Sequence, residues 1–269
     1  MIVTGPALTS LVLAGMFCDM NASISPKVRY LLAQVRNGDD PMRDQEIDCF
    51  AWALHCEREQ ISVHDLLNGP PSDAVLARHD VVMVGGSGDY STVPEAPWLD
   101  RTLDFLRDMH VRQKPVFGSC WGFQALGKAF GGTVITDVER AELGTPDVTL
   151  TAAGQTDPVF GSMPKTFPVL LGHEDRVVDL PGNAVLLAST TQVTNQAFRF
   201  EDAPIYATQF HPELHRETFL DRIRTYPKYV NKILGIPYAE FERICRDVPA
   251  TREILTGFVQ HVLEGKPSA

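Results

Sequence analysis

The chain is poor in positive charge. Its 269 residues include 24 lysines and arginines against 34 aspartates and glutamates, which gives a formal net charge of −10 at pH 7. The basic residues are scattered along the chain, and an acidic protein of this kind repels a phosphate backbone or an anionic membrane surface. We therefore expect neither a nucleic-acid partner nor a membrane partner.

Cysteine is also scarce. The cysteines are odd in number and include no C-x-x-C pair, so the sequence predicts neither a disulfide framework nor a zinc knuckle. Reduced thiols of this kind suit a cytoplasmic protein, and the cytoplasm is the predicted location. The five cysteines are Cys18, Cys49, Cys56, Cys120 and Cys245.

Long hydrophobic runs are lacking. The apolar stretch 8–17 has no basic segment before it and is too short to span a bilayer. We interpret residues 1–25 as an N-terminal extension and expect it to be disordered. A start codon assigned too far upstream would give the same pattern. Internal repeats of 20 to 50 residues and low-complexity tracts are absent from the sequence.

Apolar runs alternate with helical patterns in the first half of the chain. This alternation predicts a parallel sheet with helices on both faces, an α/β fold of the three-layer, doubly wound, mostly parallel type. The carboxyl ends of such strands meet at one edge of the sheet, where ligands bind. The predicted strands are 29–35, 61–67, 81–84 and 115–117, and the predicted helices lie around 47–54, 98–109 and 123–130.

The pattern changes after Gly132. Short strand-like runs follow with no convincing helix between them, and they predict antiparallel additions to the sheet. The short runs are 133–136, 148–150, 169–171, 184–189 and 198–200.

A further strand at 205–210 leads to a helix expected from Glu213 to residue 225, and 226–264 again has helical spacing. We expect a domain over 26–225 and a helical C-terminal extension over 226–269. An exposed apolar stripe on this extension would be unfavourable, so we expect it to pack against the core or a partner chain. The residues expected to make this contact are Phe241, Ile244, Phe258 and Val262.

The segment GSCWG places Cys120 between Gly118 and Gly122. Because a strand is expected to end just before Cys120 and a helix to follow it, the cysteine lies on a sharp turn of the nucleophile-elbow type. Flanking glycines let neighbouring backbone pass close to such a turn, and a helix N-terminus stabilises negative charge on sulfur. The motif indicates a reactive cysteine; on this motif alone, a buried structural thiol is the alternative.

The segment QFHPE supplies a base for that cysteine. Pro212 disfavours helical backbone at His211, so this histidine should lie at a strand end. Glu213 could accept a hydrogen bond from the imidazole and stabilise its protonated form, which completes a Cys-His-Glu triad. The alternatives are a core histidine and an acid that complements the dipole of the next helix.

A glycine-rich turn follows the third predicted strand in VVMVGGSGDYS. Acyl transfer needs hydrogen-bond donors at the developing oxyanion, and the amides of Gly86 and Trp121 could converge there. A phosphate-binding turn is the competing interpretation, but the spacing is not G-x-G-x-x-G and no Walker lysine follows. We therefore favour the oxyanion role.

These segments resemble the class I glutamine amidotransferase domain, a flavodoxin-like α/β family, and in particular the free-standing or fused amidotransferase part of GMP synthase. The resemblance extends over residues 29–224. One departure is Ser87, where many family members have proline. The segments that carry the resemblance are VGGSGDYS, GSCWGFQALGKAFGG, ERAELG, GHEDRV and QFHPE, in this order.

The resemblance implies a role for each matching residue. Cys120 would be the nucleophile, His211 the base and Glu213 the residue that orients it. The implied oxyanion donors are Gly86 and Trp121, and the implied substrate contacts are Gly88 and Gln124. Because Ser87 departs from the family pattern, the implied donors are less firmly based than the triad. No cofactor is implied.

Two histidine pairs invite a comparison with metal sites. His173 lies close to Asp175 in the sequence, and His211 and His215 are four residues apart. However, Pro212 holds His211 outside the helix, and HPELH is not the H-E-x-x-H motif. We expect no metal at either place.

The predicted activity is hydrolysis of the glutamine side-chain amide through a cysteine thioester, which releases glutamate and ammonia. The chain contains no ATP-pyrophosphatase motif, so an ammonia acceptor would be a separate synthetase subunit. Two alternatives remain open. One is a stand-alone γ-glutamyl peptidase or hydrolase with the same triad, and the other is a regulatory subunit without catalytic activity.

Overall fold

The computed structural model describes residues 28–227 and 229–264. The N-terminal extension predicted over 1–25 lies outside the described residues. Within the part of the chain that is described, no helix is long and apolar enough to cross a membrane.

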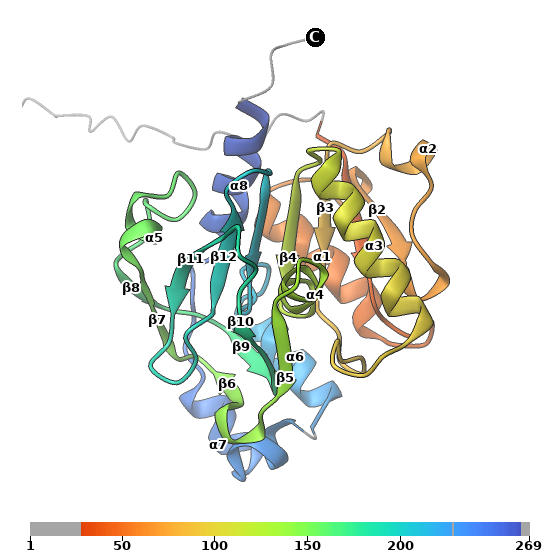
Figure 1. The fold of residues 1–269 in the computed structure, drawn as a ribbon. Coiled ribbons are helices and arrows are strands. Elements are labelled where there is room, and N and C mark those ends of the chain that lie inside the picture. The colour runs from red at the N-terminus through yellow and green to blue at the C-terminus, as the bar shows by residue number, and fades with distance from the viewer. Residues whose placement is uncertain (1–27, 228, 265–269) are drawn as a thin grey trace, which may run out of the picture.

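A nine-stranded mixed sheet forms the centre of the fold (Figure 1). Its first five strands run parallel in the order β2-β1-β3-β4-β13, an order typical of doubly wound folds, so their carboxyl ends share one edge. The predicted α/β fold is confirmed. In this spatial order the strands are β2 (Ile61–Asp65), β1 (Tyr30–Gln34), β3 (Val81–Val84), β4 (Val116–Ser119) and β13 (Ile205–Thr208).

The antiparallel additions expected after Gly132 are present. Four strands extend the sheet beyond β13, and two small two-stranded sheets lie beside it. The four are β12 (Ala197–Phe200), β11 (Ala184–Ser189), β7 (Asp147–Leu150) and β8 (Thr166–Pro168). The small sheets pair β5 (Thr133–Thr136) with β10 (Asp175–Asp179) and β6 (Glu142–Gly144) with β9 (Leu171–His173).

Two expectations for this region were wrong. The run 169–171 is not one strand, because β8 ends at Pro168 and β9 begins at Leu171. Its apolar residues are fully buried where the chain passes from one sheet to another, so burial and not strand pairing explains the pattern. A short helix, α5 (Ala152–Thr156), also interrupts the strands, and the Thr151 hydroxyl caps it by accepting from the Gly154 amide at 3.0 Å.

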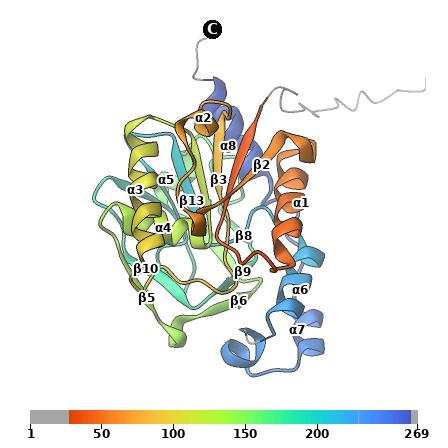
Figure 2. The same ribbon diagram turned by 90° about the vertical axis from the view of Figure 1, so that its right-hand side faces the viewer.

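Helices cover both faces of the sheet (Figure 2). α1 (Met42–Leu54) and α8 (Glu253–Glu264) pack on one face, and α3 (Pro97–Val111) and α4 (Trp121–Ala129) pack on the other. Their apolar stripes close two separate cores, which gives the three layers that the sequence predicts. The remaining helical segments are η1 (Arg58–Gln60), η2 (Leu66–Asn68), α2 (Asp73–Leu76), η3 (Val138–Arg140), α6 (Arg216–Thr225), η4 (Val230–Leu234) and α7 (Tyr238–Ile244).

The helix after the HPE segment starts later than the sequence predicts. α6 begins at Arg216 and not at Glu213, and the backbone amide of His215 donates to the Thr218 hydroxyl at 3.2 Å. The amide of Leu214 donates to the carbonyl of His211 at 3.3 Å, so the intervening residues form a turn. Glu213 is therefore not a first-turn helix acid.

The helices after residue 226 pack against the rest of the molecule. Phe258 of α8 lies in the core beside Phe117, with ring centroids 5.3 Å apart, and Phe241 of α7 packs on Phe219 at 6.1 Å. Of the predicted contact residues, Phe241, Phe258 and Val262 are buried, but Ile244 is 53% exposed and its assignment was wrong. The division into a domain and an extension stays a prediction.

Replacing Phe258 with alanine tests the contribution of α8. The side chain is fully buried, so Phe258→Ala should lower the free energy of unfolding by about 3–5 kcal/mol, measured by urea denaturation. Ile244→Ala is the control and should change stability little. Equal effects of the two substitutions would contradict the packing of α8 in the core.

Candidate active site

Cys120 occupies the turn between β4 and α4. It is one of three non-glycine residues with positive φ among those described, with φ 51° and ψ −97°, and its amide donates to the Thr208 carbonyl at 2.8 Å. A Cβ atom on Gly122 would lie 2.4 Å from the Val84 carbonyl oxygen, and one on Gly118 would lie 2.8 Å from Gly122. Only glycine fits at either position, so the two glycines permit the elbow.

His211 lies beside Cys120 at the same edge of the sheet. Its backbone amide donates to the Leu170 carbonyl at 3.0 Å, and its Nδ1 donates to Glu213 Oε1 at 2.7 Å. A Cβ atom on Gly86 would lie 3.1 Å from His211 Cε1 and 3.8 Å from Cys120 Cβ. The structure therefore brings the nucleophile, the base and the glycine-rich turn together.

Glu213 is completely buried and has three donors. Besides His211, the Ser119 hydroxyl donates to Oε2 at 2.8 Å, and Arg222 Nη1 donates to Oε1 at 3.4 Å. A carboxylate without solvent is stable only when paired and hydrogen-bonded, and these contacts meet that need. They also hold the carboxylate against the imidazole nitrogen, so His211 presents its other nitrogen to the site.

The pair has strongly perturbed pKa values. Burial alone would lower the pKa of His211, but the charge of Glu213 and the hydrogen-bonded thiol of Cys120 outweigh it and raise the pKa to about 9. Burial would raise the pKa of Glu213, but His211, followed by Arg222 and Ser119, lowers it to about 2. The imidazolium–carboxylate pair is therefore favoured at neutral pH.

A second buried carboxylate, Glu46 of α1, faces the glycine-rich turn. It accepts from Arg36 Nε and Nη2, both at 3.1 Å, from Gln34 Nε2 at 3.0 Å and from the Gly86 amide at 3.1 Å. Arg222 Nη2 lies 3.8 Å from the same carboxylate. Glu46 thereby links the end of β1, the turn after β3 and α6.

The two predicted oxyanion donors differ in the structure. The Trp121 amide belongs to the first turn of α4, where an intrahelical acceptor is lacking by geometry. The Gly86 amide donates to Glu46, so it is already engaged. Gly86 lies next to Cys120, as expected, but its donor would have to leave Glu46 before it could reach an oxyanion.

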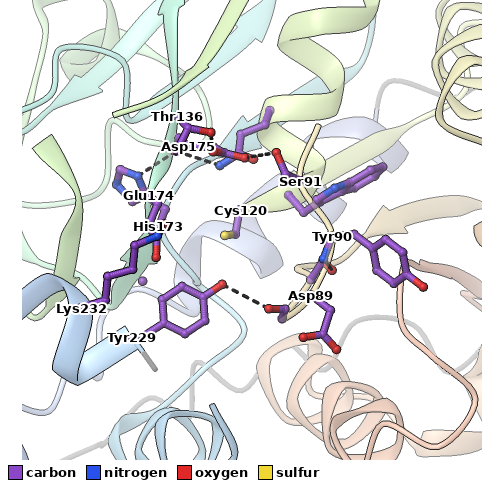
Figure 3. Close-up of a pocket in the computed structure, with 15 residues that line it drawn as sticks. Asp89, Tyr90, Ser91, Cys120, Thr136, His173, Glu174, Asp175, Tyr229 and Lys232 are labelled. Carbon is purple, nitrogen blue, oxygen red and sulfur yellow. Dashed lines mark hydrogen bonds and ion pairs between the residues drawn. The ribbon is translucent and has the colours of Figure 1, made fainter. Parts of the chain in front are cut away.

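A cavity of about 260 Å³ opens beside Cys120 (Figure 3). Both predicted substrate contacts line it. Gln124 Nε2 donates to the Asp175 carbonyl at 3.0 Å, and the Gly88 carbonyl accepts from the Tyr229 hydroxyl at 3.3 Å. The ring of Tyr226 packs on Gly88 so closely that a Cβ there would lie 2.3 Å from its Cζ.

The two histidine pairs compared with metal sites have other contacts. His173 Nδ1 faces the Asp175 carbonyl at 2.9 Å, and its Nε2 faces Glu142 at 3.2 Å. The ring of His215 packs against Trp52, with centroids 5.0 Å apart, whereas His211 pairs with Glu213. Across residues 28–227 and 229–264, no group of three His, Cys, Asp or Glu side chains is arranged to hold a metal ion.

Several residues at the site are not predicted by the sequence. Ser119 directly precedes the nucleophile, and its place in the GSC motif could have drawn attention to it. The others gave no local signal, because their partners are far away along the chain. They are Arg36, Glu46, Arg222, Tyr229 and Lys232.

Sequence relatives fall into two groups. The chain is 33% identical over 120 residues to a free-standing glutamine-hydrolyzing subunit of GMP synthase from Pyrococcus abyssi, which covers 44% of this chain and 62% of that protein. It is 27% identical over 177 residues to gamma-glutamyl peptidase 4 of Arabidopsis thaliana, which covers 65% of this chain and 70% of that protein. The chain spans only 22% and 29% of the length of two full GMP synthases that it also matches.

Solved structures agree with the fold. A glutamine amidotransferase from Thermotoga maritima superposes with a TM-score of 0.69 at 21% identity, and the match covers 88% of this chain and 99% of that one. The model of the family "Glutamine amidotransferase class-I" matches residues 57–223, which include the elbow and the HPE segment. This chain therefore belongs to the class-I glutamine amidotransferase family.

Proposed function

We propose that the chain hydrolyses the side-chain amide of glutamine through a thioester on Cys120. The observation that carries the proposal is the elbow cysteine beside His211, whose other nitrogen is held by a fully buried Glu213. This arrangement has the nucleophile, base and orienting acid of a covalent hydrolase. A non-catalytic regulatory subunit would not need such a pair.

The first step forms the thioester. The Cys120 thiolate attacks the amide carbonyl carbon, the C–N bond breaks, and protonated His211 gives its proton to the departing ammonia. The Trp121 amide can stabilise the oxyanion directly. The Gly86 amide contributes only after its hydrogen bond to Glu46 breaks.

The second step releases glutamate. His211, now neutral, takes a proton from water, the water oxygen attacks the thioester carbonyl, and the C–S bond breaks to return the Cys120 thiolate. Glu213 stays ionised throughout and stabilises the imidazolium, because its pKa is held near 2. Gly88 and Gln124 would contact the substrate from the cavity wall.

The fate of the ammonia separates two forms of this function. The GMP synthase relative suggests that ammonia passes to a separate synthetase subunit, whereas the peptidase relative, matched over more of its length, suggests a stand-alone γ-glutamyl peptidase. The kcat/KM values of the purified chain for glutamine and for a γ-glutamyl dipeptide distinguish them. Faster cleavage of the dipeptide favours the peptidase. A cytoplasmic location stays a prediction.

Cys120→Ala should abolish hydrolysis. Loss of the covalent route should reduce kcat by at least about 10³-fold with the fold intact, measured by ammonia release and by circular dichroism. Cys245→Ala is the control, because Cys245 is buried in a different cluster and should be dispensable for activity. A Cys120→Ala variant with more than a tenth of the wild-type rate would remove Cys120 from the mechanism.

Glu213→Gln should lower the pKa of His211. Without the carboxylate charge, burial dominates, so the imidazole should lose its proton at a lower pH, as followed by NMR titration. The rate should fall mainly in kcat with KM little changed, and by less than in Cys120→Ala. An unchanged kcat and an unchanged His211 titration would contradict the orienting role.

The same variant tests the pH dependence of stability. Since the pKa of Glu213 is depressed from 4.5, its stabilisation is complete above pH 4.5 and is lost as pH falls toward 2. Since the pKa of His211 is raised from 6.5, its stabilisation is complete below pH 6.5 and is lost as pH rises through 9. The stability difference between wild type and Glu213→Gln should therefore be largest between these pH values, and urea denaturation at pH 5.5 and 9.5 measures it.

A further inference from the structure

The segment that follows α6 forms one wall of the cavity. Tyr229 and Lys232 face the cavity from the side opposite Cys120 (Figure 3). Neither residue belongs to the segments that resemble the amidotransferase family, and the family model ends before them, at residue 223. Their place at the cavity is thus a feature of this chain that the family assignment does not explain.

Buried charges fix the start of this segment. The Tyr226 hydroxyl donates to Asp40 Oδ2 at 2.7 Å and accepts from Arg36 Nη1 at 3.1 Å. Its ring covers Gly88, and the Tyr229 hydroxyl donates to the Gly88 carbonyl at 3.3 Å. The segment is therefore tied to the turn that follows β3, and Lys232 is carried to the cavity by an anchored backbone.

Lys232 is the only lysine or arginine among the described residues that line this cavity. It forms an ion pair with Glu174, which also lines the cavity and is 18% exposed at the side chain. The carboxylate oxygens of Asp175 are already held by the hydroxyls of Ser91 and Thr136, both at 2.5 Å. Lys232 and Glu174 are therefore the charges best placed to pair with a ligand.

We propose that Lys232 and Glu174 bind the amino-acid head of the γ-glutamyl substrate, with Lys232 pairing with its α-carboxylate and Glu174 with its α-ammonium group. This inference rests on the proposed function, which puts the reacting carbonyl at Cys120. The head of the same molecule is a zwitterion and must lie elsewhere in the cavity. A pair of opposite charges on one wall is its electrostatic complement.

The existing ion pair can open at little cost. The Lys232 side chain is 50% exposed, and an ion pair in contact with solvent contributes little to stability. Each partner can therefore exchange its protein counterion for the opposite charge of the substrate. Such an exchange selects a free glutamyl head over one whose amino or carboxyl group is blocked.

Tyr229 completes the recognition wall. Burial raises the pKa of its hydroxyl, and the nearby Cys120, Glu174, Asp175 and Asp89 raise it further, so the hydroxyl stays protonated and donates to Gly88. The aromatic ring is thereby held beside Cys120, where it can pack against the methylene groups of the glutamyl chain.

Blocked substrates test each charge separately. For glutamine, Lys232→Met should raise KM about tenfold with kcat within about twofold of wild type, as expected for a contact equally strong in the ground and transition states. For the α-amide of glutamine, which lacks the carboxylate, the same substitution should change KM little. Glu174→Gln should behave in the mirror-image way, with a raised KM for glutamine and little change for N-acetylglutamine.

Lys165→Met is the matched control, because Lys165 is exposed and does not line the cavity. The proposal is overturned if Lys232→Met affects glutamine and its α-amide equally, or if it affects neither.

Alkylation of Cys120 provides a readout that does not need hydrolysis. A diazoketone analogue of glutamine carries the same amino-acid head, whereas iodoacetamide lacks it, and mass spectrometry follows both reactions. Lys232→Met should slow labelling by the diazoketone about tenfold and leave labelling by iodoacetamide unchanged. Failure of the proposed function with this difference intact would leave the head site standing, and equal labelling of both proteins by the diazoketone would overturn it.

Discussion

The close approach of α4 to β3 at Gly122 determines how the site is built. The Gly122 amide donates to the Gly85 carbonyl at 3.2 Å, and any side chain on Gly122 would collide with the Val84 carbonyl. This contact pulls the start of α4 against the end of β3, so Cys120 is forced into its left-handed conformation beside Gly86. The strain is retained because β4, β13 and α4 hold both sides of the turn.

Two buried carboxylates share the cations around this turn. Glu213 stabilises the catalytic imidazole, and Glu46 holds the Gly86 amide, while Arg222 lies within reach of both. Desolvating so many charges costs free energy that pairing only partly returns, so the network favours one defined geometry more than it favours stability. The same network that orients His211 also withholds the Gly86 amide from the oxyanion position.

Local signals were sufficient for the elbow and for the parallel strands, because glycine spacing and apolar runs are read from neighbouring residues. They failed where the tertiary structure decides. Glu213 looked like a helix acid, but its contacts with Ser119 and Arg222 keep it outside α6. Lys232 gave no signal at all, since only the folded chain brings it to Glu174. Long-range charge pairs of this kind leave no pattern in the sequence.

The C-terminal part of the chain joins the two cores to the site. α8 fills the face of the sheet that β1, β3 and β4 present, and Tyr226 enters the charged network at Arg36 and Asp40. The cavity wall formed by Lys232 therefore lies between two anchors, one apolar and one ionic. Because the wall is fixed at both ends, it meets the substrate with little conformational freedom left to lose, and this preorganisation is what a recognition contact outside the catalytic triad requires.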